Sequence, residues 1–263
     1  MKLFKTLTLA AASVVLCASA FAIDGREVVQ KALDVPDPSY TQSAVQMDLI
    51  EKNGAKETRN VIEYGRSKND LKAVVMTFLS PASVKDTRFL LQENEGSKAD
   101  DKFIYLPDLR STRRVSTAEG GKAFMGTDAS YDDLSTRDID EDTHTLQKEE
   151  NKNGYDCYVV RSDPKDVNAA QYLYRIQWID KKTWVPVYAE MYDKKGKLIK
   201  TLTVEKMDVV TSEDGKNSYN TPMITYMQNV QTGHSTRLSI KKIVVDKPIQ
   251  DRVFTQNFLN TGK

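Results

Sequence analysis

Four acidic side chains have a spacing that could bind calcium. Asp138, Asp140, Asp142 and Glu149 fall at the first, third, fifth and twelfth positions of an EF-hand loop, where carboxylates supply oxygen ligands. The glycine that this loop needs at its sixth position is replaced by Thr143, and no helical pattern flanks the run. We therefore interpret these residues as a solvated edge between two elements and predict no metal site.

Residues that commonly carry catalysis are few in this chain. His144 and His234 fall in segments of alternating polarity, which predicts solvent-facing positions in strands. Cys157 lies in another alternating run without a neighbour that would stabilise its thiolate, so we expect a buried, inert thiol. The sequence contains no hydrolase, phosphate-loop or dinucleotide-binding motif. It therefore predicts a protein that is not an enzyme, with no catalytic residues and no cofactor.

Residues 1–22 have the pattern of a signal peptide. Lys2 and Lys5 precede an apolar run, and Ala20-Phe21-Ala22 has the small residues of a cleavage site. We predict cleavage after Ala22, a periplasmic location and one domain over residues 23–263; a retained N-terminal anchor is the alternative. The 38 basic and 37 acidic residues nearly balance, which predicts no nucleic-acid partner.

The rest of the chain predicts a mainly β protein. Asp24, followed three residues later by Glu27, predicts the start of a short helix that ends near Pro36. From Ser43 onward apolar residues alternate, and turn sequences such as Asn53-Gly54 divide about ten or eleven strands. Strands joined by such hairpins form an antiparallel sheet, and a sheet of this size tends to curl into a barrel or half-barrel.

Residues 103–134 interrupt this alternation. A strand-like run ends at Pro107, and the three arginines Arg110, Arg113 and Arg114 follow. Gly120-Gly121 then precede Phe124-Met125. The arginines could contact a lipid headgroup or a partner, or could lie on a solvated strand face.

Aromatic residues gather later in the chain. Tyr172, Tyr174 and Trp178 have the spacing of one strand face, and Met191 lies on the next predicted strand. Such residues could fill an ordinary core, or they could line an apolar concave surface that binds lipid. The pattern alone leaves both interpretations open.

Four short motifs in the central third of the chain resemble a known family. Their order and spacing are similar to those of the outer-membrane lipoprotein-sorting proteins, which are LolA-like periplasmic lipid- or lipoprotein-binding proteins. The motifs are Tyr105-Leu106-Pro107, Arg113-Arg114-Val115, Phe124-Met125-Gly126-Thr127-Asp128 and Tyr131-Asp132-Asp133-Leu134.

The resemblance implies a strongly curved antiparallel sheet, forming a half-open barrel with a few short helices as its lid. It implies a carrier that binds lipid acyl chains or lipoproteins in an apolar cavity and moves them toward the outer membrane. The alternative is a non-transporting accessory or sensor module of an inner-membrane exporter of the resistance-nodulation type. In this interpretation residues 120–134 form a lid, and replacing Phe124 and Met125 by Asp abolishes lipid binding while the fold stays intact.

The expected site combines this lid with the aromatic strand residues. Headgroup or partner contacts are expected from Arg110, Arg113 and Arg114. Lipid contacts are expected from Tyr105, Phe124, Met125, Tyr131, Leu134, Tyr172, Tyr174, Trp178 and Met191.

Overall fold

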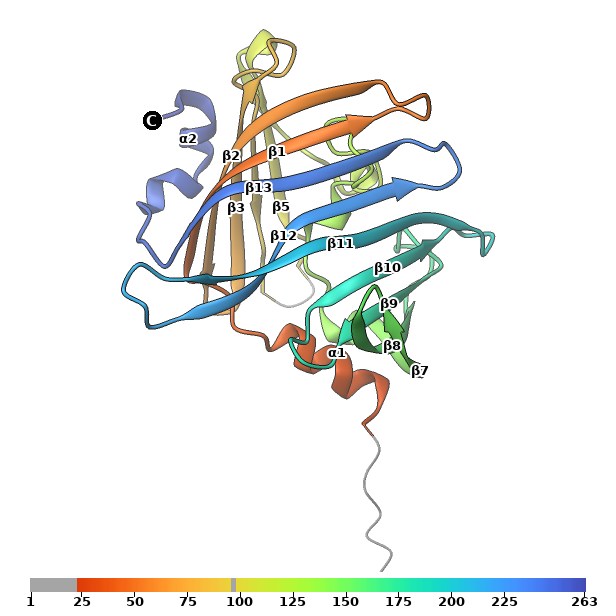
Figure 1. Ribbon diagram of the computed structural model, residues 1–263. Helices are drawn as coiled ribbons and strands as arrows, with labels where there is room; N and C mark the ends of the chain where they lie inside the picture. Colours follow the sequence, from red (N-terminus) through yellow and green to blue (C-terminus); the bar gives the residue numbers. More distant parts are fainter. Residues whose placement is uncertain (1–22, 96–97) are drawn as a thin grey trace, which may run out of the picture.

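A computed structural model describes residues 23–95 and 98–263, so the predicted signal peptide lies outside the described residues. Every strand belongs to one antiparallel sheet of 13 strands, in the order β6-β5-β4-β3-β2-β1-β13-β12-β11-β10-β9-β8-β7 (Figure 1). The strands are β1 (Tyr40–Ile50), β2 (Lys56–Lys68), β3 (Leu71–Ser80), β4 (Arg88–Gln92), β5 (Asp101–Leu106), β6 (Ser111–Arg114), β7 (Asp142–Lys152), β8 (Tyr155–Pro164), β9 (Tyr174–Asp180), β10 (Pro186–Tyr192), β11 (Leu198–Thr211), β12 (Ser218–Asn229) and β13 (Ser235–Val245).

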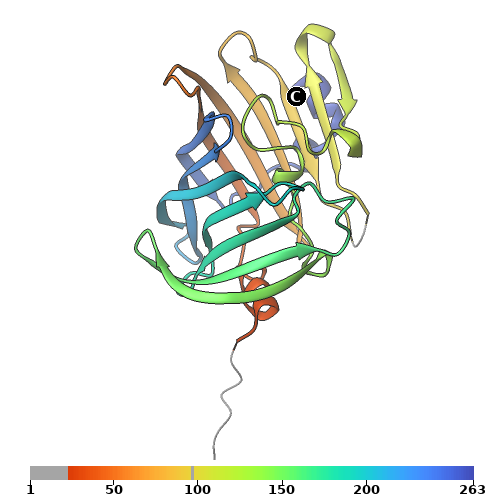
Figure 2. The same ribbon diagram turned by 90° about the vertical axis from the view of Figure 1, so that its right-hand side faces the viewer.

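The predicted half-open, mainly β fold is confirmed, with more strands than the ten or eleven expected. The sheet curls without closing, because β6 and β7 are its two edges (Figure 2). Strand β6 was predicted only as one of two alternatives for the arginines, because Ser111–Arg114 has no alternation of apolar and polar residues.

The sheet consists of two meanders that meet in its middle. Strands β1 to β6 form one and β7 to β13 the other, and pairing of β1 with β13 joins them. The two edges, β6 and β7, are consecutive in the chain. They are linked by residues 115–141, here called the central segment, which lies inside the hollow of the sheet (Figure 2). This segment contains the 3-10 turns η2 (Thr117–Glu119), η3 (Asp132–Leu134) and η4 (Ile139–Glu141).

The two faces of the sheet carry separate apolar clusters, because successive side chains of a strand point to opposite faces. Met76, Phe78 and Phe89 belong to a cluster on the concave face, beneath the central segment. Val75 and Leu90, on the same two strands, belong to a second cluster on the convex face. Both faces of this half of the sheet are therefore covered.

Two helices complete the fold. Helix α1 (Gly25–Leu33) begins after Asp24, whose side chain accepts a hydrogen bond from the backbone N–H of Glu27, as the sequence predicts. It packs against β7 and β8. Helix α2 (Gln256–Thr261) follows the turn η5 (Asp251–Phe254), and both cover the convex face of β3 to β6. Within the described ranges, no helix is long and apolar enough to cross a membrane.

Candidate functional site

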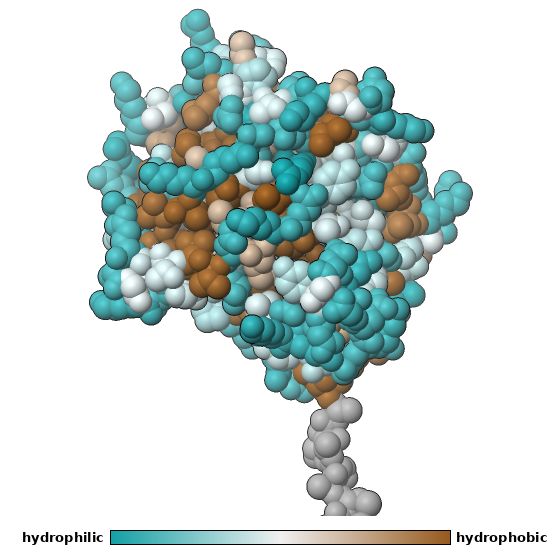
Figure 3. Space-filling model, viewed as in Figure 1, coloured by the Kyte–Doolittle hydropathy of each residue, from teal (hydrophilic) through white to brown (hydrophobic). Residues whose placement is uncertain are grey.

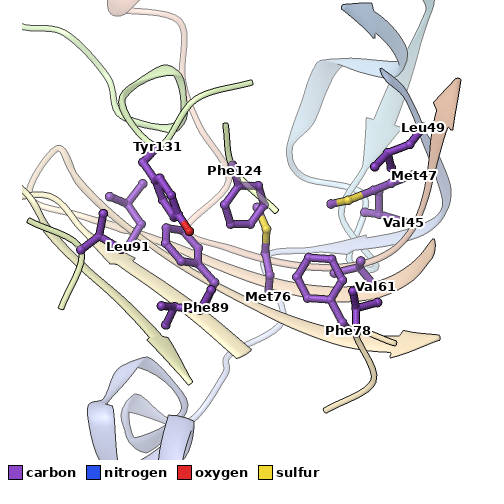
Figure 4. Packing of buried hydrophobic residues seen from close by; sticks show 13 residues of the cluster. Val45, Met47, Leu49, Val61, Met76, Phe78, Phe89, Leu91, Phe124 and Tyr131 are labelled. Carbon is purple, nitrogen blue, oxygen red and sulfur yellow. The ribbon is translucent and has the colours of Figure 1, made fainter. Parts of the chain in front are cut away.

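Two aromatic side chains of the central segment fill the concave face. Phe124 and Tyr131 are only 2% and 6% exposed, and they pack edge to face with ring centroids 5.6 Å apart. Both rings contact Phe89 of β4, at centroid distances of 4.9 Å and 5.9 Å (Figure 4). The hollow between β1 and β6 is therefore occupied by the chain's own side chains.

This burial corrects one expectation from the sequence. Phe124→Asp would place a charge among Phe78, Phe89 and Tyr131, in a buried apolar cluster where a charged group is costly. The fold would not stay intact, so this substitution cannot test ligand binding by itself. Truncation to alanine keeps the site apolar and is the better probe.

One polar tether fastens the central segment to β13. The carboxylate of Asp128 accepts hydrogen bonds from Thr236 Oγ1 at 2.7 Å and from His234 Nδ1, 2.8 Å away, and the Asp128 backbone N–H donates to Thr236 Oγ1. Asp128 is 7% exposed. The two histidines were expected to face solvent, but both bond to the central segment, since His144 Nε2 lies 3.0 Å from the carbonyl oxygen of Ile139.

A second tether spans the hollow through two adjacent aspartates. Asp132 pairs with Lys102 of β5 at 2.7 Å, and Asp133 pairs with Lys200 of β11 at 3.1 Å. Tyr172, just before β9, donates its hydroxyl hydrogen to Asp133 at 2.9 Å. The side chains of Asp133 and Lys200 are each only 10% exposed. Successive residues of one turn thus hold two distant parts of the curved sheet.

Glycine is needed at two positions of the central segment. A Cβ atom on Gly120 would lie 2.2 Å from the Asp132 carboxylate, so a larger residue would displace the partner of Lys102. Gly126 has φ +78°, a left-handed conformation that favours glycine. It follows Met125, whose carbonyl oxygen accepts a hydrogen bond from the buried guanidinium of Arg59 in β2.

The acidic run that resembles a calcium loop is used for ion pairs. Asp142 accepts hydrogen bonds from Arg137 at 2.7 Å and Arg175 at 2.8 Å. Burial alone would raise the pKa of Asp142, but the hydrogen bonds and charges of these two arginines outweigh it and lower that pKa. Within residues 23–95 and 98–263, no group of three or more potential ligands is arranged to hold a metal ion.

Two grooves open beside the end of the central segment. The first, of about 890 Å³, is bordered by residues 30–38, by residues 136–139 and by the ends of β1, β12 and β13. The second, of about 660 Å³, lies between residues 98–102 and residues 169–172. Both are of the size that small ligands occupy in proteins. The residues that border both are Asp70, Glu93, Thr136, Arg137 and Asp138.

The structure brings six of the nine expected lipid contacts together on the concave face. Phe124 and Tyr131 lie in the cluster beneath the central segment, and Met125 and Leu134 pack against it. Tyr172 and Met191 form a neighbouring cluster with Ala189, and the bond from Tyr172 to Asp133 joins it to the central segment.

The other three lie on the convex face. Tyr105 packs in the cluster beneath α2, under the guanidinium of Arg88. Trp178 is paired with Tyr188, which alternates along β10 with Ala189 and therefore points outward. Tyr174 shares the outward face of β9 with Trp178. The sequence pattern missed this division because β9 begins only at Tyr174, so Tyr172 does not follow the strand alternation.

The arginine cluster is exposed. Arg113 pairs with Glu119 at 3.1 Å and Arg114 with Asp101 at 2.6 Å. Arg110 ends the turn η1 (Pro107–Leu109) in a left-handed conformation. Arg114 borders the second groove. A headgroup or partner contact for these residues stays a prediction.

The expected burial of the Cys157 thiol is confirmed. Cys157 is fully buried, and its pKa is raised to about 11, first by burial and then by the nearby charge of Asp180. The tether partners Arg59, Lys102, Lys200 and His234 were not predicted as site residues. A lone basic residue in a strand gives no sign that it binds a segment far away in the sequence.

Comparisons with known proteins agree with this architecture. A family model described only as an uncharacterized protein matches residues 70–261. A search of curated proteins found no match.

Three crystal structures share the fold over nearly their full lengths. The first, an outer membrane lipoprotein-sorting protein domain from Vibrio parahaemolyticus, is 28% identical with a TM-score of 0.81, over 90% of this chain and 98% of that one. A DUF1329 family protein from Desulfovibrio piger is 26% identical with a TM-score of 0.82, over 89% and 97%. A LolA superfamily protein from Nitrosomonas europaea is 17% identical with a TM-score of 0.68, over 90% and 100%, and shares the fold alone. Because the family model covers most of its length, the chain belongs to the family that this model describes, and its fold is that of the LolA superfamily protein.

Proposed function

We propose that the protein is a periplasmic carrier that binds the acyl chains of lipids or lipoproteins against the concave face of its sheet and moves them toward the outer membrane. One observation carries the proposal: in the described part of the chain, the apolar hollow between β1 and β6 is filled by side chains of the irregular central segment. The name of the Vibrio parahaemolyticus relative, a lipoprotein-sorting domain, supports the same class of ligand.

In this proposal an acyl chain takes the place of the central segment's side chains. Burial of an acyl chain contributes about 0.8 kcal/mol per methylene group, so a long chain can replace the contacts of Phe124 and Tyr131. The tethers through Asp128, Asp132 and Asp133 are discrete polar contacts, which can separate and form again as the segment moves. Binding and release then need no catalytic group.

No feature of the described residues favours the alternative of an exporter's accessory module. We therefore propose the carrier function and no second one. The predicted signal peptide over residues 1–22 would take the chain to the periplasm.

Native mass spectrometry tests binding. Protein isolated from cells that contain membranes is expected to retain lipid, which organic extraction removes and identifies. An uncharged fluorescent acyl probe should then compete with that lipid. Repeated absence of bound lipid, together with no binding of the probe, would overturn the proposed function.

Hydrogen exchange tests displacement of the central segment. The Phe124 N–H donates to the Ala129 carbonyl and the Tyr131 N–H to the Lys122 carbonyl, so both amides should exchange faster when lipid is bound. The Leu259 N–H of α2, which donates to the Thr255 carbonyl on the convex face, is the internal control and should not change. Lipid binding with unchanged exchange in residues 122–131 would show that the ligand occupies another place.

A further inference from the structure

One carboxyl group on the concave face lacks a partner. Glu63 lies in β2 two residues after the buried Val61, and its neighbours across the sheet are Ser43 of β1 and Met76 of β3. The exposed fractions of Val61, Ser43 and Met76 are 1%, 3% and 8%, respectively. Among the residues that the structure describes, none bonds to the Glu63 carboxylate.

The surroundings of this carboxylate disfavour its charge. Burial raises the pKa of Glu63 to about 7, and no hydrogen bond or neighbouring charge opposes that effect. Its side chain nevertheless keeps part of its surface accessible. Glu63 therefore resembles a group that lines an internal hollow, at a cost in stability that a packed apolar residue would avoid.

Residues near Glu63 in the sheet border the first groove. Thr41 and Ser67, which border this groove, lie on the same face as Ser43 and Glu63 and alternate with outward-facing residues. Ile243, also in the groove, is paired directly with Ser43. Ser43 and Glu63 do not border the groove themselves, but they form the next pair on this face after Thr41 and Gly65.

The border of the groove has an excess of negative charge. Its acidic residues outnumber its two basic ones, and both basic residues already have partners: Lys72 pairs with Asp37 at 2.8 Å, and Arg137 pairs with Asp142 at 2.7 Å. The potential along this path therefore favours a cation over an anion. Leu33, Ile139 and Trp184 add apolar surface to the same groove.

We propose that the ligand of this hollow is an amphiphile with an aliphatic body and a primary amino group, and that its ammonium donates a hydrogen bond to Glu63. The inference rests on the proposed carrier function and specifies its ligand. An ammonium would give the carboxylate the partner it lacks, whereas a carboxylate ligand would face repulsion at the groove and at Glu63. The aliphatic body would take the place of the Phe124 and Tyr131 side chains, which lie in one cluster with Met76, the neighbour of Glu63.

The test compares dodecylamine, dodecanol and dodecanoate, which share one chain and differ in the polar end. Each competes with an uncharged fluorescent acyl probe at neutral pH, below the concentration at which micelles form. The amine is expected to bind about tenfold more tightly than the alcohol, as one charge-assisted hydrogen bond allows, and the carboxylate more weakly than both.

Two variants test whether Glu63 causes the tighter binding of the amine. Glu63→Gln keeps the shape of the side chain and is expected to weaken amine binding about tenfold while leaving the alcohol unchanged. Glu63→Leu removes the polar group and should abolish the preference altogether. Glu51→Gln, in the exposed turn after β1, is the matched control and should bind as the original protein does.

The outcomes separate the two proposals. If all three amphiphiles bind equally well, or if Glu63→Gln retains the amine preference, the inference about Glu63 is wrong while the carrier function stands. If none of the three displaces the probe, and the isolated protein holds no lipid, both proposals fall. Thermal unfolding of each variant shows that a loss of binding is not a loss of fold.

Discussion

The sheet has two covers that are built in different ways. On the concave face the central segment is mostly irregular, and it is positioned by paired charges and single hydrogen bonds from β2, β5, β11 and β13. On the convex face α2 supplies Leu259 and Phe258, and η5 supplies Phe254, to the cluster beneath them. The helix has a polar cap, since the side chain of Thr255 accepts a hydrogen bond from the Phe258 N–H.

We infer from this difference that the convex cover stabilises the sheet, whereas the concave cover takes part in the proposed binding of ligand. A capped helix that packs on an apolar cluster stabilises the sheet. It does so with few charged pairs or single hydrogen bonds that could separate and form again. In the proposed function, the irregular segment leaves its place as its discrete tethers separate, while the strands beneath it stay folded. The view in Figure 3 shows that hydrophobic surface also remains beside α2, bordered by hydrophilic side chains, so the convex cover is not a complete layer.

The largest expected effect compares one phenylalanine from each cover. Phe124 and Phe254 are both 2% exposed, and we expect truncation of either to alanine to lower the free energy of unfolding by about 3–5 kcal/mol. Phe124→Ala should also tighten binding of the uncharged acyl probe, because the space it leaves lies on the ligand face. Phe254→Ala should leave that affinity unchanged. Denaturant unfolding and fluorescence titration measure the two quantities, and equal effects on affinity would remove the distinction between the covers.

The next effect compares one tether from each cover. Asp133→Asn would leave the ammonium of Lys200 buried without its counter-charge, and we expect a loss of about 2–3 kcal/mol in the free energy of unfolding. On the convex side, Asp251 pairs with Arg66, but its side chain is 74% exposed. Asp251→Asn should therefore cost no more than about 1 kcal/mol. If both variants lower the free energy of unfolding by a similar amount, the two ion pairs do not differ in their contribution to stability.

Glu63 adds a pH dependence to the concave face. Its pKa is about 7 in the folded protein, above the ordinary 4.5, so the folded state binds more protons than the unfolded state between these values. Stability should therefore fall as pH rises through this window, by an amount on the order of 2 kcal/mol, and should lack this component in Glu63→Gln. Unfolding temperatures of both proteins across the window measure it. If the unfolding temperatures of the original protein and of Glu63→Gln change in parallel across this pH window, burial does not raise the pKa of Glu63.

The smallest effect concerns the cap of α2. Thr255→Ala removes the acceptor for the Phe258 N–H and should lower the free energy of unfolding by about 1 kcal/mol. Affinity for the acyl probe should not change, because α2 lies on the convex face. A change in affinity would reveal coupling between the covers that their separate clusters do not suggest.

The fold could be predicted because its elements repeat local patterns. Alternation of apolar residues gave most strands, and the turn after β1 has Gly54 at φ +86°, as its Asn-Gly sequence requires. Asp24 and Glu27 gave the start of α1 correctly. Strand β6 stayed one of two alternatives because its four residues carry no apolar alternation, and its place is set by pairing with β5.

The candidate site was only partly predictable. Phe124 and Tyr131 were recognised from their motifs, but their burial depends on Phe89, which lies far from them in the sequence. Asp133 belongs to the same motifs, yet its partner Lys200 is an ordinary strand residue until the sheet curls and brings β11 near the central segment. The face on which Trp178 lies likewise depends on where β9 begins.

The pairing of β1 with β13 has a consequence for how the chain folds. Each meander forms from hairpins between neighbouring strands, whereas this seam joins Thr41 to Val245, near opposite ends of the described chain. Contacts between residues so distant in sequence form slowly, because a long loop must close first. Until it closes, β1 and β13 each expose an unpaired edge on which another chain could add a strand. Newly synthesised molecules are therefore expected to pass through an aggregation-prone stage that lasts until β1 and β13 have paired.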